Sequence, residues 1–439
     1  MLGRLAARVS LARYARQSYF GWSIVLSSAV VYALMGGLNY SGLSLYFLPL
    51  VREFGVSRTR VSLIFSLRSI LDMFSGPIGG LMVDKLGPRF MVAGGMILGG
   101  LGFILLALTQ SYLQFLLVLT FLVSLGFSMP DHGVSASINL WFRRRLGLAI
   151  SIATSGIAIG GFLLTPLIAW LVLGYGWRWA AAVSGLIMLA IGLPQALMFR
   201  KPRADETTRE DLPASPRQHR GERPIPPAVT SPSPFSNFDF SVREALGTRA
   251  YWLLGVSLGL RLTAQLTLMV HIVPILVSKG ISEGIAATLL ALVALTRLPI
   301  SIGSGFISDR WSRQRTSAIA MIFGVLACIT VLLGARGLVV GIPFALLFGS
   351  AQAANGITFA LVGQFFGRRN FGTLRGSVSL VPGLTSAIGP VLAGWSYDQT
   401  GSYSITLVAL AGAYLLAGLI FWNLKAPSTI GKNHFPIGR

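Results

Sequence analysis

Several ionisable side chains interrupt long apolar stretches of this sequence. They are Arg68, Asp72, Asp131, His132, Arg261, His271 and Arg297. An ionisable side chain at the centre of a membrane-spanning helix costs about 2.5–3.5 kcal/mol on insertion scales, so such a residue is a candidate for function. The residue types suit two kinds of chemistry. A guanidinium binds a carboxylate, whereas a carboxylate or an imidazole takes up and releases a proton.

Arg297 is the strongest candidate for binding an anion. It lies in the middle of an apolar run, with no acidic residue four positions before or after it. A guanidinium in that position matches a carboxylate through two parallel hydrogen bonds. Arg261 is a second candidate cation. The alternative is a structural role, in which Arg297 pairs with Asp131 or Asp72 across a helix bundle.

Three residues are candidates for proton coupling, and each has a structural alternative. Asp72 lies four residues after Arg68, so the two share a helix face and can neutralise each other. Asp131 follows Pro130, where a helix is kinked and its backbone partly unpaired, and it is either a proton site or the partner of an arginine. His271 lies near the end of its apolar run, where it can instead snorkel or cap the helix.

Four uncharged polar residues could orient a substrate through hydrogen bonds: Asn39, Tyr40, Gln352 and Asn355. Each could equally make an ordinary hydrogen bond between helices.

The composition indicates that membrane-spanning helices position these residues. The chain has 439 residues, of which 53% are hydrophobic and 11% charged, whereas a soluble domain is about 25% charged. A soluble enzyme is thereby excluded, and a polytopic membrane protein remains. A spanning helix needs about 20 apolar residues, and the sequence offers twelve such runs. They lie near residues 21–47, 60–82, 90–109, 113–140, 146–173, 179–199, 250–277, 285–307, 316–335, 338–366, 373–396 and 402–424.

One long polar connection, 200–248, divides these runs into six and six. It is rich in proline and poor in aliphatic residues, which predicts a disordered tether, with a regulatory or partner-binding role as the alternative. We therefore expect an all-α membrane protein with five parts: a cytoplasmic segment 1–20, a six-helix bundle 21–199, the loop 200–248, a second six-helix bundle 249–424 and a tail 425–439.

The distribution of Lys and Arg predicts the orientation. With the N-terminus inside, 27 of them fall on the cytoplasmic side and 6 on the other. Cytoplasmic loops of membrane proteins carry an excess of Lys and Arg, so both termini are predicted to be cytoplasmic, in a cell (inner) membrane. This distribution also accounts for most of the net charge of +22, so no nucleic acid partner is expected.

Two short segments at equivalent places of the two halves are alike. One contains Gly80, Asp84 and Arg89, and the other contains Asp309 and Arg310. A carboxylate at a helix end can accept hydrogen bonds from the first turn of a neighbouring helix, and it can pair with arginine. Asp84, Arg89, Asp309 and Arg310 are therefore candidates for gating. The alternative for the basic residues is a purely topological role.

The pattern from Gly80 to Arg89, G-x-x-x-D-[RK]-x-G-x-[RK], resembles the motif between the second and third helices of the major facilitator superfamily. The second copy departs from it, with Ser312 at the glycine position. Narrower features resemble the monocarboxylate transporter and oxalate–formate antiporter branch. They are Phe20-Gly21-Trp22, Tyr46-Phe47-Leu48-Pro49-Leu50 and Trp141-Phe142 before a basic cluster.

This resemblance implies a secondary transporter that moves a small organic anion, a monocarboxylate, by alternating access, with proton coupling as an option. It also implies a substrate-binding arginine in the eighth span. The family position corresponds to Ser301, and Arg297 lies one turn away, about 6 Å along the axis. The lysines that the branch carries in its first or eleventh span are absent here, which favours one carboxylate over two.

Other functions compete with this interpretation. An exporter of drugs or other hydrophobic solutes would explain Gly156, Gly160 and Gly161, but the proline of its motif is delayed to Pro166. A transporter-like sensor is a third class.

The sequence has no P-loop, nucleophile elbow, zinc motif or dinucleotide fingerprint, so no enzyme, cofactor or metal is expected. The protein is expected to be a monomer.

Overall fold

The computed structural model describes residues 20–142, 145–200, 202, 240–334, 337–352, 355–367 and 371–427. The predicted parts 1–20, 200–248 and 425–439 therefore fall largely outside the described residues. Within that part of the chain every regular element is a helix, which confirms the all-α class.

Ten described helices are long and apolar enough to cross a membrane. An eleventh is formed if the two pieces of α3 (Arg58–Leu86), bent by 54° between Ser75 and Ile78, are one span. The apolar helix α15 (Leu338–Ala351) is shorter and is followed by α16 (Asn355–Phe366). The predicted count of twelve is consistent with this arrangement, although length and composition alone do not confirm it. Large apolar side chains such as Leu108, Leu333 and Trp422 are exposed, as a protein with lipid as its solvent requires.

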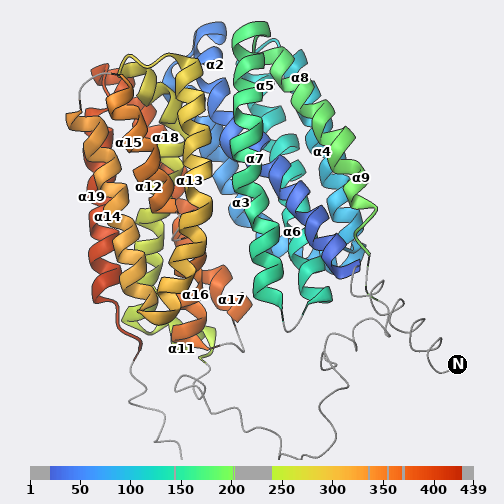
Figure 1. Cartoon of the computed structure of the whole chain (residues 1–439), viewed down its shortest axis with the longest axis vertical. Coiled ribbons are helices and arrows are strands. Elements are labelled where there is room, and N and C mark those ends of the chain that lie inside the picture. The colour runs from blue at the N-terminus through green and yellow to red at the C-terminus, as the bar shows by residue number, and fades with distance from the viewer. Residues whose placement is uncertain are drawn as a thin grey trace, which may run out of the picture.

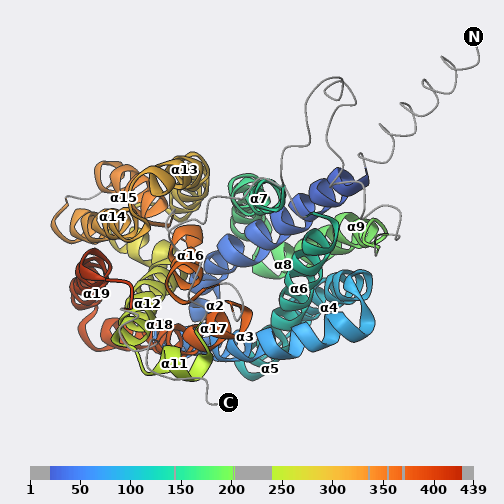
Figure 2. The ribbon, with the colours of Figure 1, turned by 90° about the horizontal axis from the view of Figure 1, so that it is seen from below.

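The helices form two groups that stand side by side (Figures 1 and 2). The first group contains the span Phe20–Phe54, which ends in α2 (Phe47–Phe54), and α3. Its other helices are α4 (Pro88–Leu108), α5 (Tyr112–Leu117), α6 (Ser124–Trp141), α7 (Leu146–Tyr175), α8 (Trp177–Ile187) and α9 (Leu193–Ala196). The second group contains α11 (Val242–Leu246), α12 (Arg249–Ser278), α13 (Glu283–Arg310), α14 (Arg313–Leu333), α15, α16, α17 (Phe371–Val378), α18 (Leu380–Thr400) and α19 (Ser404–Asn423).

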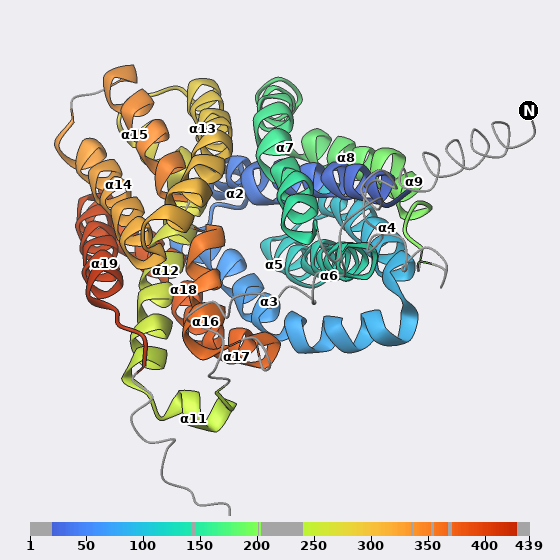
Figure 3. The same cartoon turned by 60° about the horizontal axis from the view of Figure 1, so that its bottom comes forward.

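Two helix pairs make the most extensive contacts between the groups. Helix α3 packs along α18, and α7 packs along α13. The upper end of the molecule is the one where α3 and α19 begin and α18 ends, and the lower end is the one where α3 ends and α4 begins (Figures 1 and 3). The span that begins at Phe20 starts at the lower end, and α19 also ends there (Figure 1). The two ends of the described bundle therefore lie on the same side.

The first span is not a uniform α-helix. It widens into a π-helix, η1 (Met35–Ser41), and then tightens into a 3₁₀ segment, η2 (Gly42–Tyr46). Such interruptions are frequent at functional sites because they redirect side chains and leave backbone groups available. Asn39 and Tyr40 both lie in η1.

Glycines let α7 and the first span approach each other closely. A Cβ atom at Gly156 or Gly160 would collide with the carbonyl oxygen of Ala29 or Ala33 in the first span. Both positions therefore require glycine for packing. This role explains the Gly156 to Gly161 pattern without an exporter motif.

Candidate functional site

A polar network joins the two helix groups at mid-height. The Gln265 side chain of α12 donates a hydrogen bond to the Tyr40 hydroxyl over 2.6 Å. Arg261 donates to the Oε1 atom of Gln265 over 3.4 Å, and the Arg297 guanidinium of α13 lies 5.7 Å from the centre of the Tyr40 ring. The structure thus brings together three predicted binding residues, Arg261, Arg297 and Tyr40.

Gln265 is the residue of this network that the sequence did not single out. It lies four positions after Arg261 and therefore on the same face of α12. That spacing was the available signal. The polar side chain is 4% exposed, and its amide links Arg261 in the second group to Tyr40 in the first.

A second set of polar contacts extends from Asn39, the neighbour of Tyr40. Arg68 of α3 donates a hydrogen bond to the Oδ1 atom of Asn39, and its Nε atom lies 3.6 Å from Asp72. The predicted local pair of Arg68 and Asp72 is therefore confirmed. Asn39 makes a hydrogen bond between helices, which was the alternative to direct substrate contact.

These residues border a cavity of about 130 Å³ between α3, η1 and α12. Asn39, Tyr40, Arg68 and Asp72 form its polar wall. Ser44 and Ser69 also border it, and the other lining residues are apolar. Gln352 is buried at the end of α15 and is not among the residues that border this cavity. The side chain of Asn355 lies outside the described residues.

Both acids proposed as structural partners of Arg297 have other contacts. Asp131 accepts a hydrogen bond from the Tyr32 hydroxyl over 3.0 Å, and that hydroxyl also lies 3.3 Å from Ser135. Asp72 pairs with Arg68. Among the described residues Arg297 forms no ion pair with either acid. The conformation seen here therefore does not use Arg297 as a structural counter-ion for Asp72 or Asp131.

His271 lies in a different environment from the one predicted for it. Its ring is fully buried, and its Nδ1 and Nε2 atoms lie 3.0 Å from the Tyr403 hydroxyl and the Pro390 carbonyl oxygen. Nε2 is also 3.1 Å from the hydroxyl of Ser62. The snorkelling alternative is thus wrong, because the ring is fully buried and its nitrogen atoms contact protein groups of α3, α18 and the residue before α19. His271 is not among the residues that border the cavity.

Other polar contacts close the upper end of the molecule. The carboxylate of Asp398, at the end of α18, accepts hydrogen bonds from the backbone N–H groups of Arg58 and Thr59 over 3.1 and 2.9 Å. The guanidinium of Arg58 lies 3.5 Å from the centre of the Tyr397 ring. Nearby, an ion pair joins the first span to α13. We use the name upper seal for the whole set of residues at this end, which are Arg52, Arg58, Thr59, Glu283, Tyr397, Asp398 and Tyr403.

Tyr403 connects Arg58 to His271. Arg58 can only donate, so the Tyr403 hydroxyl accepts its hydrogen bond over 2.8 Å and has its own proton available for Nδ1 of His271. Burial raises the pKa of Tyr403, which keeps this proton in place. With Nδ1 as acceptor, Nε2 of His271 carries the proton and donates to the carbonyl oxygen of Pro390.

The predicted gating residues lie at the lower end, where Asp84, Arg89 and Arg310 are exposed. In the part of the chain that the structure describes, none of the three forms an ion pair. The side chain of Asp309 lies outside the described residues. The two ends of the molecule therefore differ, because polar contacts join the helix groups at the upper end while these motif residues are separate at the lower end.

Comparison with known proteins places this geometry in a family. The sequence profile of the Major Facilitator Superfamily matches residues 24–381. Among curated relatives, Monocarboxylate transporter 13 of Rattus norvegicus is 26% identical over 402 residues, which are 91% of this chain and 87% of that protein. Monocarboxylate transporter 12 of Mus musculus is 24% identical over 448 aligned residues, which cover 98% of this chain and 90% of that protein.

Solved structures show the same fold at low sequence identity. A bacterial homologue of the human lysosomal transporter Spinster, in an inward-facing and occupied conformation, has a TM-score of 0.67 at 14% identity, over 92% of this chain and 96% of that one. A mutant peptide transporter in complex with sulfate has a TM-score of 0.68 at 15% identity, over 92% of this chain and 93% of that one.

Proposed function

The chain belongs to the Major Facilitator Superfamily and is a multi-pass membrane transporter, and from that premise we propose that it carries a small monocarboxylate by alternating access. The observation that carries this proposal is the position of Arg297. Its guanidinium faces Tyr40 across the contact between the two helix groups, beside a network that contains Arg261. A guanidinium held between the two groups can bind a carboxylate and be exposed to each side in turn.

The neighbouring residues suit one carboxylate. In the described residues no acid pairs with Arg297, whereas Arg68 is already engaged by Asp72 and Asn39. The hydroxyl of Tyr40 and the amide of Gln265 add uncharged polar groups beside the guanidinium. The similarity to proteins named monocarboxylate transporters supports the same substrate class.

We infer that the conformation is closed at the upper end and open toward the lower end. The upper seal joins the two groups, and the exposed Asp84 at the lower end forms no ion pair in the described part of the chain. With the predicted orientation in a cell (inner) membrane, the lower end faces the cytoplasm. The protein then adopts an inward-facing state. We also propose that it acts as a monomer.

Proton coupling is proposed for Asp72. Its carboxylate borders the cavity and pairs with Arg68. A proton on Asp72 would cancel its charge, release Arg68 and raise the positive charge around the cavity before the anion arrives. Asp131, bound to Tyr32 in the first group, is the second candidate.

Purified protein in proteoliposomes tests the proposed function. We expect acetate, propionate or butyrate to raise the melting temperature and to exchange across the vesicle membrane, because a ligand that binds the folded state stabilises it. The substitution Arg297→Lys keeps the charge but loses the planar fork, so affinity should fall by about 1.5–3 kcal/mol. Arg297→Ala should abolish exchange. Unchanged exchange in both variants would contradict the proposal.

A further inference from the structure

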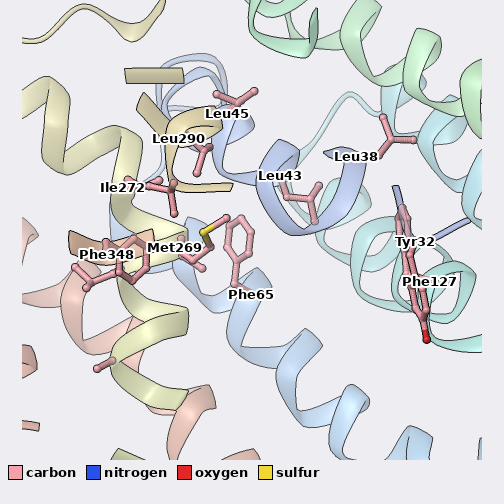
Figure 4. Packing of buried hydrophobic residues seen from close by; sticks show 14 of the residues in the cluster. Tyr32, Leu38, Leu43, Leu45, Phe65, Phe127, Met269, Ile272, Leu290 and Phe348 are labelled. Carbon is pink, nitrogen blue, oxygen red and sulfur yellow. The ribbon is translucent and has the colours of Figure 1, made fainter. Parts of the chain in front are cut away.

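The cavity beside the polar network is bordered by two chemically different sets of residues. Besides the polar ones, it is bordered by Leu43 of η2, Phe65 of α3, and Leu266, Met269 and Val270 of α12. Figure 4 shows Leu43, Phe65 and Met269 close together, although they come from three different elements. Arg297 does not itself border the cavity, but its guanidinium lies 5.7 Å from the centre of the Tyr40 ring, which does. A carboxylate bound to Arg297 would therefore place the body of the ligand beside these apolar side chains.

The two serines that border the cavity do not offer a free proton to that body. The hydroxyl of Ser44 donates to the backbone carbonyl of Ser41 over 2.9 Å. The hydroxyl of Ser69 donates to the carbonyl of Phe65 over 3.0 Å. A hydroxyl group on a ligand that faced this side would therefore lose its hydrogen bonds with water and gain few in return.

The volume limits the size of the body. An apolar cavity of about 150 Å³ accepts benzene, which has six carbon atoms, so a cavity of about 130 Å³ has room for a body of about five carbon atoms. This room suits a short chain. It does not suit a large aromatic ring system without rearrangement of the side chains.

From this division we propose that the transported monocarboxylates have a short apolar body, and that the wall formed by Leu43, Phe65, Leu266, Met269 and Val270 selects against a hydroxyl on it. The proposal rests on the proposed function, since Arg297 supplies the site for the carboxylate. It adds the kind of carbon chain that the substrate carries and the residues that discriminate between such chains.

Competition in proteoliposomes tests this preference with matched probes. Exchange of labelled butyrate is measured against unlabelled butyrate, 3-hydroxybutyrate and octanoate. We expect butyrate to compete about 10-fold to 100-fold better than 3-hydroxybutyrate, the range by which apolar pockets separate ligands that differ by one small group. We expect octanoate to compete poorly because its carbon chain exceeds the volume of the cavity.

Two substitutions move the preference in opposite ways. Met269→Gln places an amide on the wall with little change of size, and this longer side chain can offer its N–H groups to a ligand, so it should narrow the gap between butyrate and 3-hydroxybutyrate. Its matched control is Met321→Gln, because Met321 is buried in α14 and does not border the cavity. Phe65→Ala should enlarge the cavity and improve competition by octanoate, with Phe103→Ala as the control at a buried phenylalanine in α4.

The comparison of probes on the unmodified protein decides the outcome even if a variant does not fold. If 3-hydroxybutyrate competes as well as butyrate, and Arg297→Ala abolishes the exchange of both, the wall does not select and the inference is wrong while the proposed function stands. If no carboxylate exchanges in a manner that depends on Arg297, the proposed function itself fails. A strong preference for butyrate that Met269→Gln reduces and Met321→Gln leaves unchanged supports the inference.

Discussion

The carboxylate of Asp398 accepts hydrogen bonds from both the backbone N–H and the hydroxyl of Thr59, so an acid of the second helix group caps the start of a helix in the first. The first turn of α3 has unpaired N–H groups and a partial positive charge, and a carboxylate satisfies both. The contact exists only while the upper ends are together. It must break when the protein opens upward.

This relationship predicts the effect of Asp398→Asn. The substitution removes the charge but keeps the size, and it should shift the population toward the state that is open at the upper end. Hydrogen bonds to charged groups contribute about 1.5–3 kcal/mol, so the shift should be measurable. A cysteine introduced at Ser69, which borders the cavity, should react faster with a maleimide added on the upper side.

The matched control for that measurement is Glu53→Gln. Glu53 also lies at the upper end, but its carboxylate binds Trp177 and Arg178, which belong to the same helix group. It should leave the labelling rate unchanged. Equal acceleration in both variants would mean that loss of local structure, rather than opening of the upper seal, controls the reaction.

A second prediction concerns the two accounts of Arg297. If Arg297 binds substrate, Arg297→Ala abolishes exchange and a further Asp72→Asn or Asp131→Asn does not restore it. If Arg297 is a counter-ion in another conformation, removing the acid as well should recover both the melting temperature and exchange, since an unpaired buried charge is the source of the damage. Melting curves and exchange rates of the single and double variants separate the two accounts.

At the lower end we predict that Asp84 stabilises the opposite state. Asp84 is exposed at the end of α3 in the present conformation. It can contact the second helix group only when the lower ends of the two groups meet. Asp84→Asn should slow exchange without lowering the melting temperature. The control is Lys425→Gln, because Lys425 is exposed just after α19 at the same end and lies outside the motif. Exchange at the unmodified rate in the Asp84 variant would remove its gating role.

The orientation itself is a fourth prediction. Reporter fusions at Gly3, Ser231 and Lys432 should all report the cytoplasmic side, because 27 of the Lys and Arg residues are predicted to face it. These positions lie outside the described residues. A clear external signal at Ser231 would contradict the arrangement of six spans on each side of the long loop.

The sequence predicted properties that depend on short spacing or composition. Apolar length indicated the helices, and spacing of four residues indicated the pair of Arg68 and Asp72. The contact between Asp398 and Thr59 joins residues 339 positions apart, so it depends on how whole helices pack. No local pattern specified it. Gln265 is a different case, because its spacing of four residues from Arg261 was a local signal, whereas its contact with Tyr40 joins residues 225 positions apart.

The widening of the first span into η1 also could not be predicted from the sequence. It accompanies the close approach that Gly156 and Gly160 allow, and it determines where Asn39 and Tyr40 point. Apolar length predicted a helix over residues 21–47 and was right about its start, but the span continues to Phe54. It could not predict the π-helical turn that carries the two polar residues.

The last prediction concerns pH. If Asp72 takes up the coupling proton, uptake by the unmodified protein should increase as the pH falls on the loading side, since the protonated carboxylate no longer engages Arg68. Asp72→Asn resembles the protonated form permanently. It should retain exchange but lose accumulation driven by a pH gradient, and its rate should stay flat between about pH 5.5 and 7.5.

Asp131→Asn is the comparison for that experiment, because Asp131 binds Tyr32 within the first group and does not border the cavity. We expect it to keep the pH dependence of the unmodified protein. A flat profile in the Asp131 variant with a normal one in the Asp72 variant would assign the proton to Asp131. The pair of Arg68 and Asp72 would then be structural, holding Asn39 and the start of the polar network in place.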